Sequence, residues 1–492
     1  MRIMMGWVGL ALIALIGCDD GAGGDAGPRG DGAVVRDGGG ADADAGPRVD
    51  GGDRDAGTTP IATGWAPQPW EDCEGGGRTL EAGPSDYRDV LDTLMPGDTL
   101  RLGPGDYTRG LTITVSGEEG RCIVIEARDP SARPRLLGSD AFNIVAIHGA
   151  SWVKVRNLDI DGLGMDGFGV ASQGGDAMPT HHVVIEGMDM VGLGGDQQIV
   201  GVSTKSPAWD WVIRGNRIVG AGTGMYLGNS DGSQPFVRGV VELNTILDTI
   251  GYCAQIKHQN PRPTTLGMPA DGARTIIRWN VFSKGSGSST TDARPNLLIG
   301  HLPLSGDGVN DLYVIYGNFF YDNPTENLLQ AEGNLAIFAN AFVNPNGGAL
   351  RIAPHNDVPR RVDVFLNTIV SASTALTITG GDSGFAQRSR YNAIFGGSVA
   401  AGDSVGDVTG DLAAAVGALV DPSGAPTGPL DLHPSDGSLG ATIDDAELPS
   451  DVPERARDFD GRMRDRAFAG AYEGPADASA VPLTLSARSY GP

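Results

Sequence analysis

The stretch VVELNTIL, residues 240–247, consists of two short apolar runs joined at an asparagine, Asn244. The same pattern, apolar-x-apolar-x-x-Asn-x-apolar, recurs along the chain. It occurs in VKVRNLDI, WVIRGNRI, IIRWNVF, VIYGNFF, AIFANAF, DVFLNTI and RSRYNAI, whose asparagines are Asn157, Asn216, Asn280, Asn318, Asn340, Asn367 and Asn392. The related stretch VIEGMDM, with Gly187, fills the long gap between Asn157 and Asn216.

Short alternating strands at this spacing indicate a parallel β-solenoid with one coil per repeat. Most steps run from 22 residues, between Asn318 and Asn340, to 38 residues, between Asn280 and Asn318. Stacked coils place equivalent side chains about 4.8 Å apart, so an asparagine repeated at one bend can hydrogen-bond the asparagines above and below it. Asparagine-rich turns also occur in other all-β proteins, but eight copies within one alternation favour the solenoid.

Composition restricts the choice of partners. The chain has 492 residues, 76 of them glycine, and a net charge of -25. A charge of this sign opposes binding to nucleic acid or to an anionic membrane surface. A polyanionic substrate is compatible with the chain only where lysine, arginine or calcium reverses the local field. An acidic or neutral polysaccharide as partner is compatible with this restriction, and we expect a monomer.

The N-terminus predicts the cellular location of the protein. Arg2 precedes an apolar run from Gly6 to Gly17, and LIGC, Leu15 to Cys18, resembles the lipobox of bacterial lipoproteins. That resemblance implies lipidation of Cys18 after cleavage and a membrane anchor in the bacterial envelope, at the outer membrane or cell surface rather than the inner membrane. A plain secretory signal or a buried helix is the alternative. Residues 19–64, rich in glycine and aspartate, are expected to be a disordered tether.

The cysteines fit an oxidising compartment. After Cys18 the chain contains Cys73, Cys122 and Cys253. Because Cys73 and Cys122 both lie at the start of the folded region, we predict a disulfide between them, with Cys253 buried and free.

Three segments are predicted after the signal peptide and the tether. Residues 65–135 are predicted to form an N-terminal cap and the first coils. In that segment Ser85 is expected to cap a short helix that carries Val90, Leu91 and Leu94, followed by strands at TLRL, LTITV and IVIEA. Residues 136–400 are predicted to form the solenoid, and residues 401–492 a C-terminal cap and tail.

At this level of detail the chain resembles the right-handed parallel β-helix, or pectin-lyase-like, superfamily over about residues 75–400. Its opening MPGDTLRLGPGDY, residues 95–107, is similar to that of alginate lyases and chondroitinase B. Its segment DFDGRMRDRAFAGAYEG, residues 458–474, resembles a closing segment of secreted β-helix proteins. The resemblance implies an all-β, right-handed parallel β-helix with a short N-terminal capping helix and a C-terminal capping segment.

The resemblance also implies that the first sheet of each coil carries a substrate groove. Strands for this sheet are expected between successive asparagine repeats, from NIVAIHG at residue 143 to ALTITGG at residue 375. In CAQIKHQ, Ala254 and Ile256 would face inward, and Gln255 and Lys257 outward, with Lys257 exposed. Polar side chains gather at such positions: His148, Gln173, Lys205, Asn229, Gln255, Lys257, His258, His301, Gln330, Glu332, Arg351, His355 and Asn356.

A polysaccharide lyase is the enzyme that the resemblance implies. β-Elimination needs a base beside a uronate carboxylate and a cation that neutralises that carboxylate. Lys257 is the candidate base, and Arg351, His301 and His355 are candidates to neutralise or to donate a proton. Lys205, Asn229, Gln255, His258, Gln330, Glu332 and Asn356 are candidates for substrate binding. The related lyases place an arginine one coil after the lysine, but Ile299 and Gly300 stand there, and Arg278 belongs to another sheet.

Two other interpretations stay open. Zinc would need His258, His301 and His355 to converge around Glu332. No metal site and no cofactor are assigned. Calcium is left open, since Asp-rich loops can bind it, although the chain contains no EF-hand or nonapeptide pattern. The second alternative to catalysis is a carbohydrate-binding or adhesin-like structural protein of the envelope.

Overall fold

The structure is a computed structural model that describes residues 73–262, 264–285, 287 and 293–488. The predicted signal segment 1–18 with Cys18, the tether 19–64 and the membrane anchor lie outside these residues. The described strands belong to a single compact unit.

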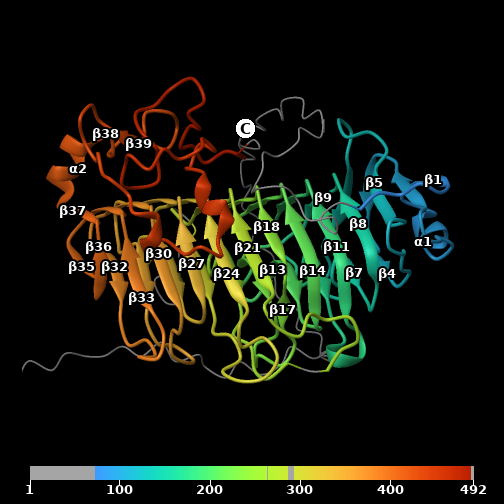
Figure 1. The fold of residues 1–492 in the computed structure, drawn as a ribbon. Helices are drawn as coiled ribbons and strands as arrows, with labels where there is room; N and C mark the ends of the chain where they lie inside the picture. The colour runs from blue at the N-terminus through green and yellow to red at the C-terminus, as the bar shows by residue number, and fades with distance from the viewer. Residues whose placement is uncertain (1–72, 263, 286, 288–292, 489–492) are drawn as a thin grey trace, which may run out of the picture. The chain divides into compact units, whose positions relative to one another are not determined.

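Three long parallel sheets make up this unit, and the chain visits them in a fixed order (Figure 1). Sheet A contains β1 (Thr79–Ala82), β2 (Thr99–Leu102), β5 (Ile123–Ala127), β8 (Ser151–Arg156), β11 (Thr180–Glu186), β14 (Ala208–Arg214), β18 (Val240–Glu242), β21 (Arg274–Arg278), β24 (Leu312–Tyr316), β27 (Leu335–Phe338), β30 (Val362–Phe365), β33 (Gln387–Arg390) and β36 (Asp403–Val405), with β17 (Phe236–Val237) beside β14.

Sheet B contains β3 (Gly105–Tyr107), β6 (Pro134–Leu137), β9 (Asp159–Asp161), β12 (Asp189–Val191), β15 (Arg217–Val219), β19 (Thr245–Leu247), β22 (Val281–Ser283), β25 (Phe319–Tyr321), β28 (Ala341–Asn344), β31 (Thr368–Ser371), β34 (Ala393–Phe395) and β37 (Val408–Gly410). Sheet C contains β4 (Leu111–Ile113), β7 (Val145–Ile147), β10 (Val170–Ser172), β13 (Val200–Thr204), β16 (Thr223–Leu227), β20 (Ala254–Ile256), β23 (Leu297–Ile299), β26 (Leu329–Ala331), β29 (Leu350–Ile352), β32 (Thr374–Ile378) and β35 (Ser398–Ala400).

Each coil runs from sheet A through sheet B to sheet C and back to sheet A one strand further on, for example β18, β19, β20 and then β21. Neighbouring strands in the three sheets are parallel and in register. Parallel strands with such crossovers form a right-handed parallel β-helix, as the sequence predicted. The strands continue past residue 400, to the end of β37.

From Asn157 to Gly406, each coil turns from sheet A to sheet B through one residue with a left-handed backbone. Leu243, Trp279, Ala339 and Leu366 hold φ between 49° and 57° at this place. Such a conformation is costly for a non-glycine residue, so the following asparagine has to stabilise the bend.

The asparagine that follows the left-handed residue forms a continuous buried ladder. Asn244 donates from its backbone N–H and from its amide nitrogen to Oδ1 of Asn280, over 3.0 and 2.9 Å, and Asn280 does the same to Asn318. The ladder begins at Asn216 and continues through Asn340, Asn367 and Asn392. It ends at Asp407, whose carboxylate accepts from Asn392; the sequence pattern did not include this residue.

Asn157 is a correction to the predicted ladder. The pairing of Asp159 with Asp189, and of Asp189 with Arg217, aligns Asn157 with Gly187 and Gly215, one residue before the ladder position. Asn157 therefore occupies the left-handed place, with φ 58°, while Leu158 and Met188 fill the ladder positions of their coils. Asparagine is tolerated in both places, so the letter alone could not separate them.

The outer face of sheet A carries an alternating ladder of charge that the sequence analysis missed. The pairing register aligns, in order, Glu81, Arg101, Glu126, Arg156, Glu186, Arg214, Glu242 and Arg278. The same row continues as Tyr316, Phe338 and Phe365, whose rings stack with centroids 5.0 and 4.8 Å apart. If one coil were skipped in the stack, side chains of like charge would become neighbours. The alternating charges therefore favour the native order of the coils.

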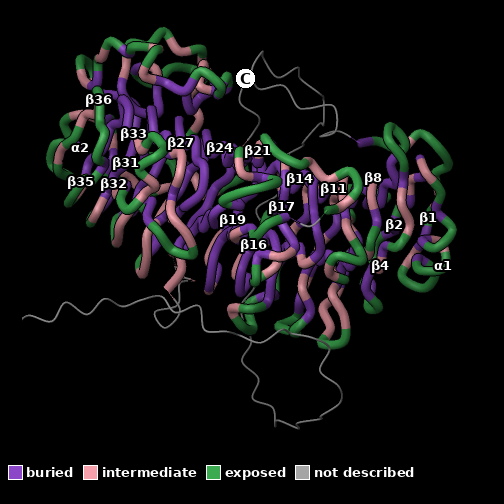
Figure 2. The backbone as a smooth tube through the Cα atoms, turned by 60° about the horizontal axis from the view of Figure 1, so that its bottom comes forward, coloured by how far each residue is buried: buried purple, intermediate pink, exposed green. Residues whose placement is uncertain are grey.

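The inside of the helix is filled by aliphatic side chains from all three sheets. Leu100, Ile160, Val202, Ile256 and Ile337 belong to one continuous cluster with almost no exposed surface. Figure 2 shows this buried interior running through the coils.

The N-terminal end is closed by α1 (Tyr87–Leu91), which packs Tyr87, Leu91 and the following Leu94 onto the first coil. Its N-cap residue is Asp86 and makes no capping hydrogen bond, so the predicted cap at Ser85 is wrong. Asp86 instead accepts a hydrogen bond from the backbone N–H of Gly83. No helix in the described part of the chain is long and apolar enough to cross a membrane.

Cys73 and Cys122 form the disulfide expected from the sequence, and Cys253 is buried with a free thiol. The bond attaches the segment before β1 to the start of β5. In the same segment, Glu74 pairs with Lys154 of β8 over 2.7 Å.

The C-terminal segments pack on the outer faces of sheets A and B. Residues 439–456, which we call the strap, place Ile443, Leu448 and Val452 on the apolar stripe of sheet A (Figure 1). Three carboxylates of the strap pair with arginines of the coils: Glu447 with Arg390, Asp451 with Arg361, and Glu454 with Arg274. On sheet B, α2 (Leu412–Ala418), the antiparallel pair β38 (Leu419–Asp421) and β39 (Asp431–Pro434), and Phe459 and Tyr472 cover Phe319, Phe395 and neighbouring apolar residues.

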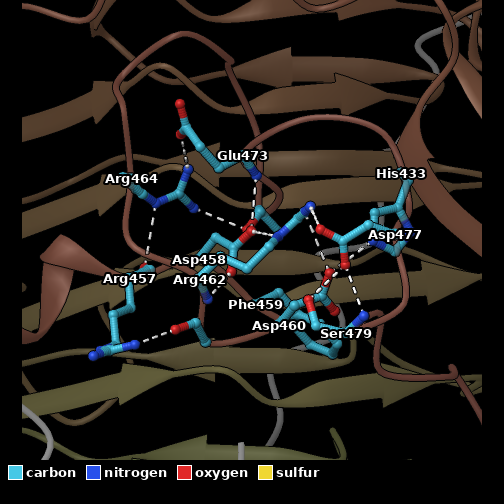
Figure 3. Close-up of polar contacts among 12 residues, drawn as sticks. His433, Arg457, Asp458, Phe459, Asp460, Arg462, Arg464, Glu473, Asp477 and Ser479 are labelled. Atoms are coloured by element: carbon cyan, nitrogen blue, oxygen red, sulfur yellow. Dashed lines mark hydrogen bonds and ion pairs between the residues drawn. The ribbon is translucent and has the colours of Figure 1, made fainter. Parts of the chain in front are cut away.

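The segment DFDGRMRDRAFAGAYEG folds around two buried carboxylates (Figure 3). Asp458 accepts hydrogen bonds from the backbone N–H groups of Arg462 and Glu473 and from the Arg462 side chain. Asp460 accepts from Nε2 of His433 over 2.8 Å, while Asp431 lies 2.6 Å from Nδ1 of the same ring. Both ring nitrogens thus face a carboxylate, which favours the doubly protonated imidazolium.

This cluster predicts a loss of stability at alkaline pH. Burial lowers the pKa of His433, but hydrogen bonds to Asp431 and Asp460 outweigh it and raise the pKa to about 9. With an unfolded value of about 6.5, the stabilisation is complete below about pH 6.5 and is lost as the pH rises through about 9, for a total of about 3 kcal/mol. Denaturant unfolding of the protein and of His433→Gln across this range measures the effect. A variant that loses as much stability between the two pH limits as the parent would contradict it.

Candidate functional site

The outer face of sheet C presents two rows of side chains. The first row lies within the strands and aligns Ala171, Ser203, Tyr226, Gln255, Leu298, Gln330 and Arg351. The second row lies two residues further along and contains His148, Gln173, Lys205, Gly228, Lys257, Gly300, Glu332 and Ala353, directly after the strand ends. The predicted first-sheet strands are therefore correct, and so is the outward direction of Gln255 and Lys257.

Two lysines converge on one tyrosine ring in the middle of these rows. Nζ of Lys205 and Nζ of Lys257 each lie 5.9 Å from the ring centroid of Tyr226. Lys205 also lies 5.6 Å from the ring of Phe168, on the coil before. Gly228, the second-row residue between the lysines, has no side chain to separate them. We call Ser203, Lys205, Tyr226, Gln255 and Lys257 the lysine–tyrosine cluster.

The cluster is more buried than its outward direction suggests. Lys257 is 7% exposed, Gln255 3% and Ser203 is fully buried. The prediction that Lys257 is an exposed strand lysine is therefore wrong. The turn at Gly232 lies over the neighbouring His258, because a Cβ at Gly232 would come within 2.7 Å of that ring. Lys257 is thus buried beside this turn, whereas Lys205 and Tyr226 are half-buried.

Two buried polar atoms in the cluster have no hydrogen-bond partner among the described residues. They are Oγ of Ser203 and Oε1 of Gln255, on either side of Tyr226. A buried polar atom without a partner is costly and calls for an explanation, such as a ligand.

The histidines lie beside the cluster but serve a turn. The rings of His258 and His301 stack with centroids 5.2 Å apart. Glu332 is 1% exposed, and its two oxygens accept hydrogen bonds from the backbone N–H groups of His301, His355, Asn356 and Asp357. These four donors occupy the carboxylate, so Glu332 positions the loop of His355 rather than binding substrate as predicted.

Arg351 stands apart from Lys257. It is exposed on β29, three strand spacings from β20, which amounts to about 14 Å. The exposed residues His355 and Asn356 and the half-buried Gln330 lie at the same end of the face. The contact of Arg351 and Lys257 with one carboxylate therefore stays a prediction.

The remaining predicted residues have local partners. The amide of Asn229 donates to Gln234, which in turn donates to Asp176 over 3.0 Å, and this chain fixes the loop after β16. Asn229 is therefore a loop residue. Among the described residues no three histidine, cysteine, aspartate or glutamate side chains are placed to hold a metal ion together.

No protein-family model matches the sequence, and no curated protein matches it. Solved structures are similar at low identity. Alginate lyase from Paenibacillus sp. str. FPU-7 is 15% identical, with a TM-score of 0.45 over 68% of this chain and 97% of that chain. The GH136 lacto-N-biosidase from Eubacterium ramulus is 11% identical, with a TM-score of 0.40 over 68% of this chain and 68% of that chain. Pectate lyase Pel9A is 12% identical, with a TM-score of 0.38 over 85% of this chain and 98% of that chain.

The three parallel sheets in this strand order make the chain a parallel β-helix.

Sequence reasoning missed Tyr226, Ser203 and Phe168. Tyr226 stands at the outward position of GMYLGNS, one coil before Gln255, so the strand alignment contained the signal. The predicted site contained only charged and amide side chains, and Tyr226 is neither. An aromatic ring in an outward row flanked by lysines is the pattern that would have found it.

Proposed function

We propose that the outer face of sheet C binds an anionic polysaccharide, with one carboxylate of the polymer held between Lys205 and Lys257. The observation that carries the proposal is the convergence of the two ammonium groups on Tyr226. Beside them, Oγ of Ser203 and Oε1 of Gln255 are buried without a hydrogen-bond partner among the described residues. The chain contains only four lysines, at 154, 205, 257 and 284, and a net charge of -25. Two of the four therefore form the local reversal of charge that such a substrate requires.

The chemistry of the cluster fits a uronate. The ring of Tyr226 offers an apolar face for a sugar, the lysines offer donors to its carboxylate, and Ser203 and Gln255 offer hydrogen-bonding groups to its hydroxyls. The rows extend over several coils at about 4.8 Å each, so neighbouring sugars of a chain can follow the sheet. Gln330, Arg351 and His355 supply polar side chains at the far end.

β-Elimination is the second function that we propose for this site, because the cluster holds a candidate base beside a second cation. In that mechanism neutral Lys257 removes the proton next to the uronate carboxylate, and protonated Lys205 neutralises the carboxylate. The electron pair forms the carbon–carbon double bond and the glycosidic bond breaks. The leaving oxygen takes a proton from the hydroxyl of Tyr226. Lys205 follows β13, two strand spacings from β20, whereas Arg351 is three spacings away, so we assign the neutralising role to Lys205.

Removing the charge of either lysine is expected to weaken binding of the acidic polymer. Lys257→Met and Lys205→Met keep the aliphatic stem and remove the charge, and each should weaken binding of alginate or polygalacturonate at least about tenfold. Arg217→Met, on sheet B, removes one positive charge from another face and should leave binding unchanged. Titration calorimetry with these polymers and with neutral dextran measures the difference. Equal weakening by all three variants would mean that only net charge matters and would contradict the site.

Catalysis has its own readout. Elimination creates an unsaturated uronate, whose ultraviolet absorbance rises with time, and Tyr226→Phe should lower the rate while polymer binding persists. Binding without any absorbance change on a panel of uronate polymers would support the carbohydrate-binding function and contradict the lyase function.

A further inference from the structure

A cavity lies between the strap and sheet A, away from the lysine–tyrosine cluster of sheet C. It has a volume of about 410 Å³ and is lined by Arg274, Asn310, Asn334, Arg361, Phe385 and Asp451, among others. This volume falls within the range of small-ligand pockets. We call it the strap pocket. Its residues come from β21 and β24, from the loops that lead into sheet A, and from the strap.

One wall of the strap pocket is aromatic. Phe385 is 38% exposed, in a loop, although a phenyl ring of this size is usually buried. The guanidinium of Arg360 lies 4.2 Å from its centroid and also donates to the carbonyl of Val309. The ring is thereby held in place by a neighbour that is itself anchored, which makes it a fixed apolar surface at the edge of the cavity.

The other walls are polar, and their charges are already compensated. Arg361 forms two hydrogen bonds with Asp451, over 2.6 and 2.7 Å, and a third with Asp363. Arg274 pairs with Glu454 over 2.7 Å. Because these guanidinium groups are paired with carboxylates, the pocket offers donors and acceptors without a net charge to attract an anion.

The lining also contains unused hydrogen-bonding capacity. Nε of Arg274 is buried and has no partner among the residues that the structure describes. Asn310 is exposed, and its amide nitrogen donates to Asp271. Planar amide, guanidinium and carboxylate groups beside an aromatic ring are suited to a ligand with many hydroxyls and one apolar face.

We propose that the strap pocket binds a neutral pyranose residue, as a glycan site separate from sheet C. The pyranose would pack its C–H face on Phe385 and direct its hydroxyls to the paired arginines and the asparagines. This inference does not depend on the function proposed for sheet C, since it uses different residues and a ligand of different charge. Together the two sites would let one chain contact an acidic and a neutral glycan.

Titration of the purified protein with cellobiose, lactose, maltose and di-N-acetylchitobiose tests the proposal. At least one is expected to bind saturably, with a Kd on the order of 1 mM, and Phe385→Ala should weaken that binding at least about tenfold. Leu304→Ala is the matched control, because Leu304 is another exposed apolar loop residue, at 48%, and does not line the pocket. Equal unfolding midpoints would show that both variants are folded.

Two further variants identify the site and the ligand class. Lys257→Met should leave disaccharide binding unchanged, whereas loss of binding in Lys257→Met would place the sugar on sheet C and overturn the proposal. Asp451→Asn removes one of the two partners of Arg361, so in a Lys257→Met background it should add affinity for glucuronic acid relative to Lys257→Met alone. Absence of saturable binding for all four disaccharides, or equal affinity in Phe385→Ala, would also overturn it.

Discussion

Replacement of Glu242 by alanine is expected to lower the free energy of unfolding by about 3–5 kcal/mol, the cost of breaking a buried ion pair from one side. Glu242 is fully buried on sheet A between Arg214 and Arg278, the latter 2% exposed. Burial alone would raise the pKa of Glu242, but Arg278 and Arg214 together hold it below its usual value. Without the carboxylate, two guanidinium groups face each other across one coil with no anion between them.

Chemical denaturation of the parent and of Glu242→Ala measures this loss. Glu81→Ala is the matched control, because Glu81 belongs to the same ladder but its side chain is 57% exposed, where an ion pair contributes only about 0–1 kcal/mol. The triple variant Arg214→Met, Glu242→Leu and Arg278→Met should recover most of the stability, since a buried triad can be exchanged for apolar side chains of similar size. If the triple variant were as unstable as Glu242→Ala, the ion pairs themselves would stabilise the fold. The loss in Glu242→Ala would then not come from the two arginines that remain without Glu242.

The sequence predicted the architecture well because the repeat records it directly. A β-helix buries the same positions in every coil, so the alternation and the asparagine are repeated in the sequence and can be aligned without knowing the contacts. Strand order, sheet assignment and the inward side chains Ala254 and Ile256 all follow from that alignment. The charge ladder of sheet A was also present in it, but it becomes visible only when one outward position is followed from coil to coil.

The site was less accessible to prediction because its properties depend on loops of irregular length. The alternation gives the direction of Lys257 but not its burial, which the turn at Gly232 and neighbouring coils decide. It places Glu332 in the same outward row but does not show that four backbone N–H groups occupy its oxygens. It gives the number of coils between Lys257 and Arg351, yet the choice of Arg351 rested on charge rather than on that separation.

The C-terminal segment shows the same division. Its motif was expected to close the helix, and Asp458, Asp460 and Arg462 do form one buried network. What the motif covers, the outer face of sheet B, depends on contacts such as the one between Ala471 and Thr368, 103 residues apart. The strap then covers sheet A and closes the strap pocket.

The second large effect is expected at the asparagine ladder. Asn280→Ala should lower the free energy of unfolding by about 3–6 kcal/mol, because several buried hydrogen bonds lose a partner at once and each such group costs about 1–3 kcal/mol. Oδ1 of Asn280 accepts two hydrogen bonds from Asn244, and its amide nitrogen donates to Val241, to Arg278 and to Asn318. The left-handed backbone of Trp279 would also lose the contacts that hold it.

Asn157 supplies the control, since it matches the same sequence pattern but lies one residue outside the ladder. Asn157→Gly should change the stability by less than about 1 kcal/mol, because glycine already occupies this left-handed place in two following coils, at Gly187 and Gly215. Denaturant unfolding of both variants separates the two roles of asparagine. If Asn157→Gly proved as damaging as Asn280→Ala, the ladder would extend one coil further than its hydrogen bonds indicate. If Asn280→Ala were as mild as Asn157→Gly, the asparagines would matter for the turn conformation and not for the hydrogen bonds between coils.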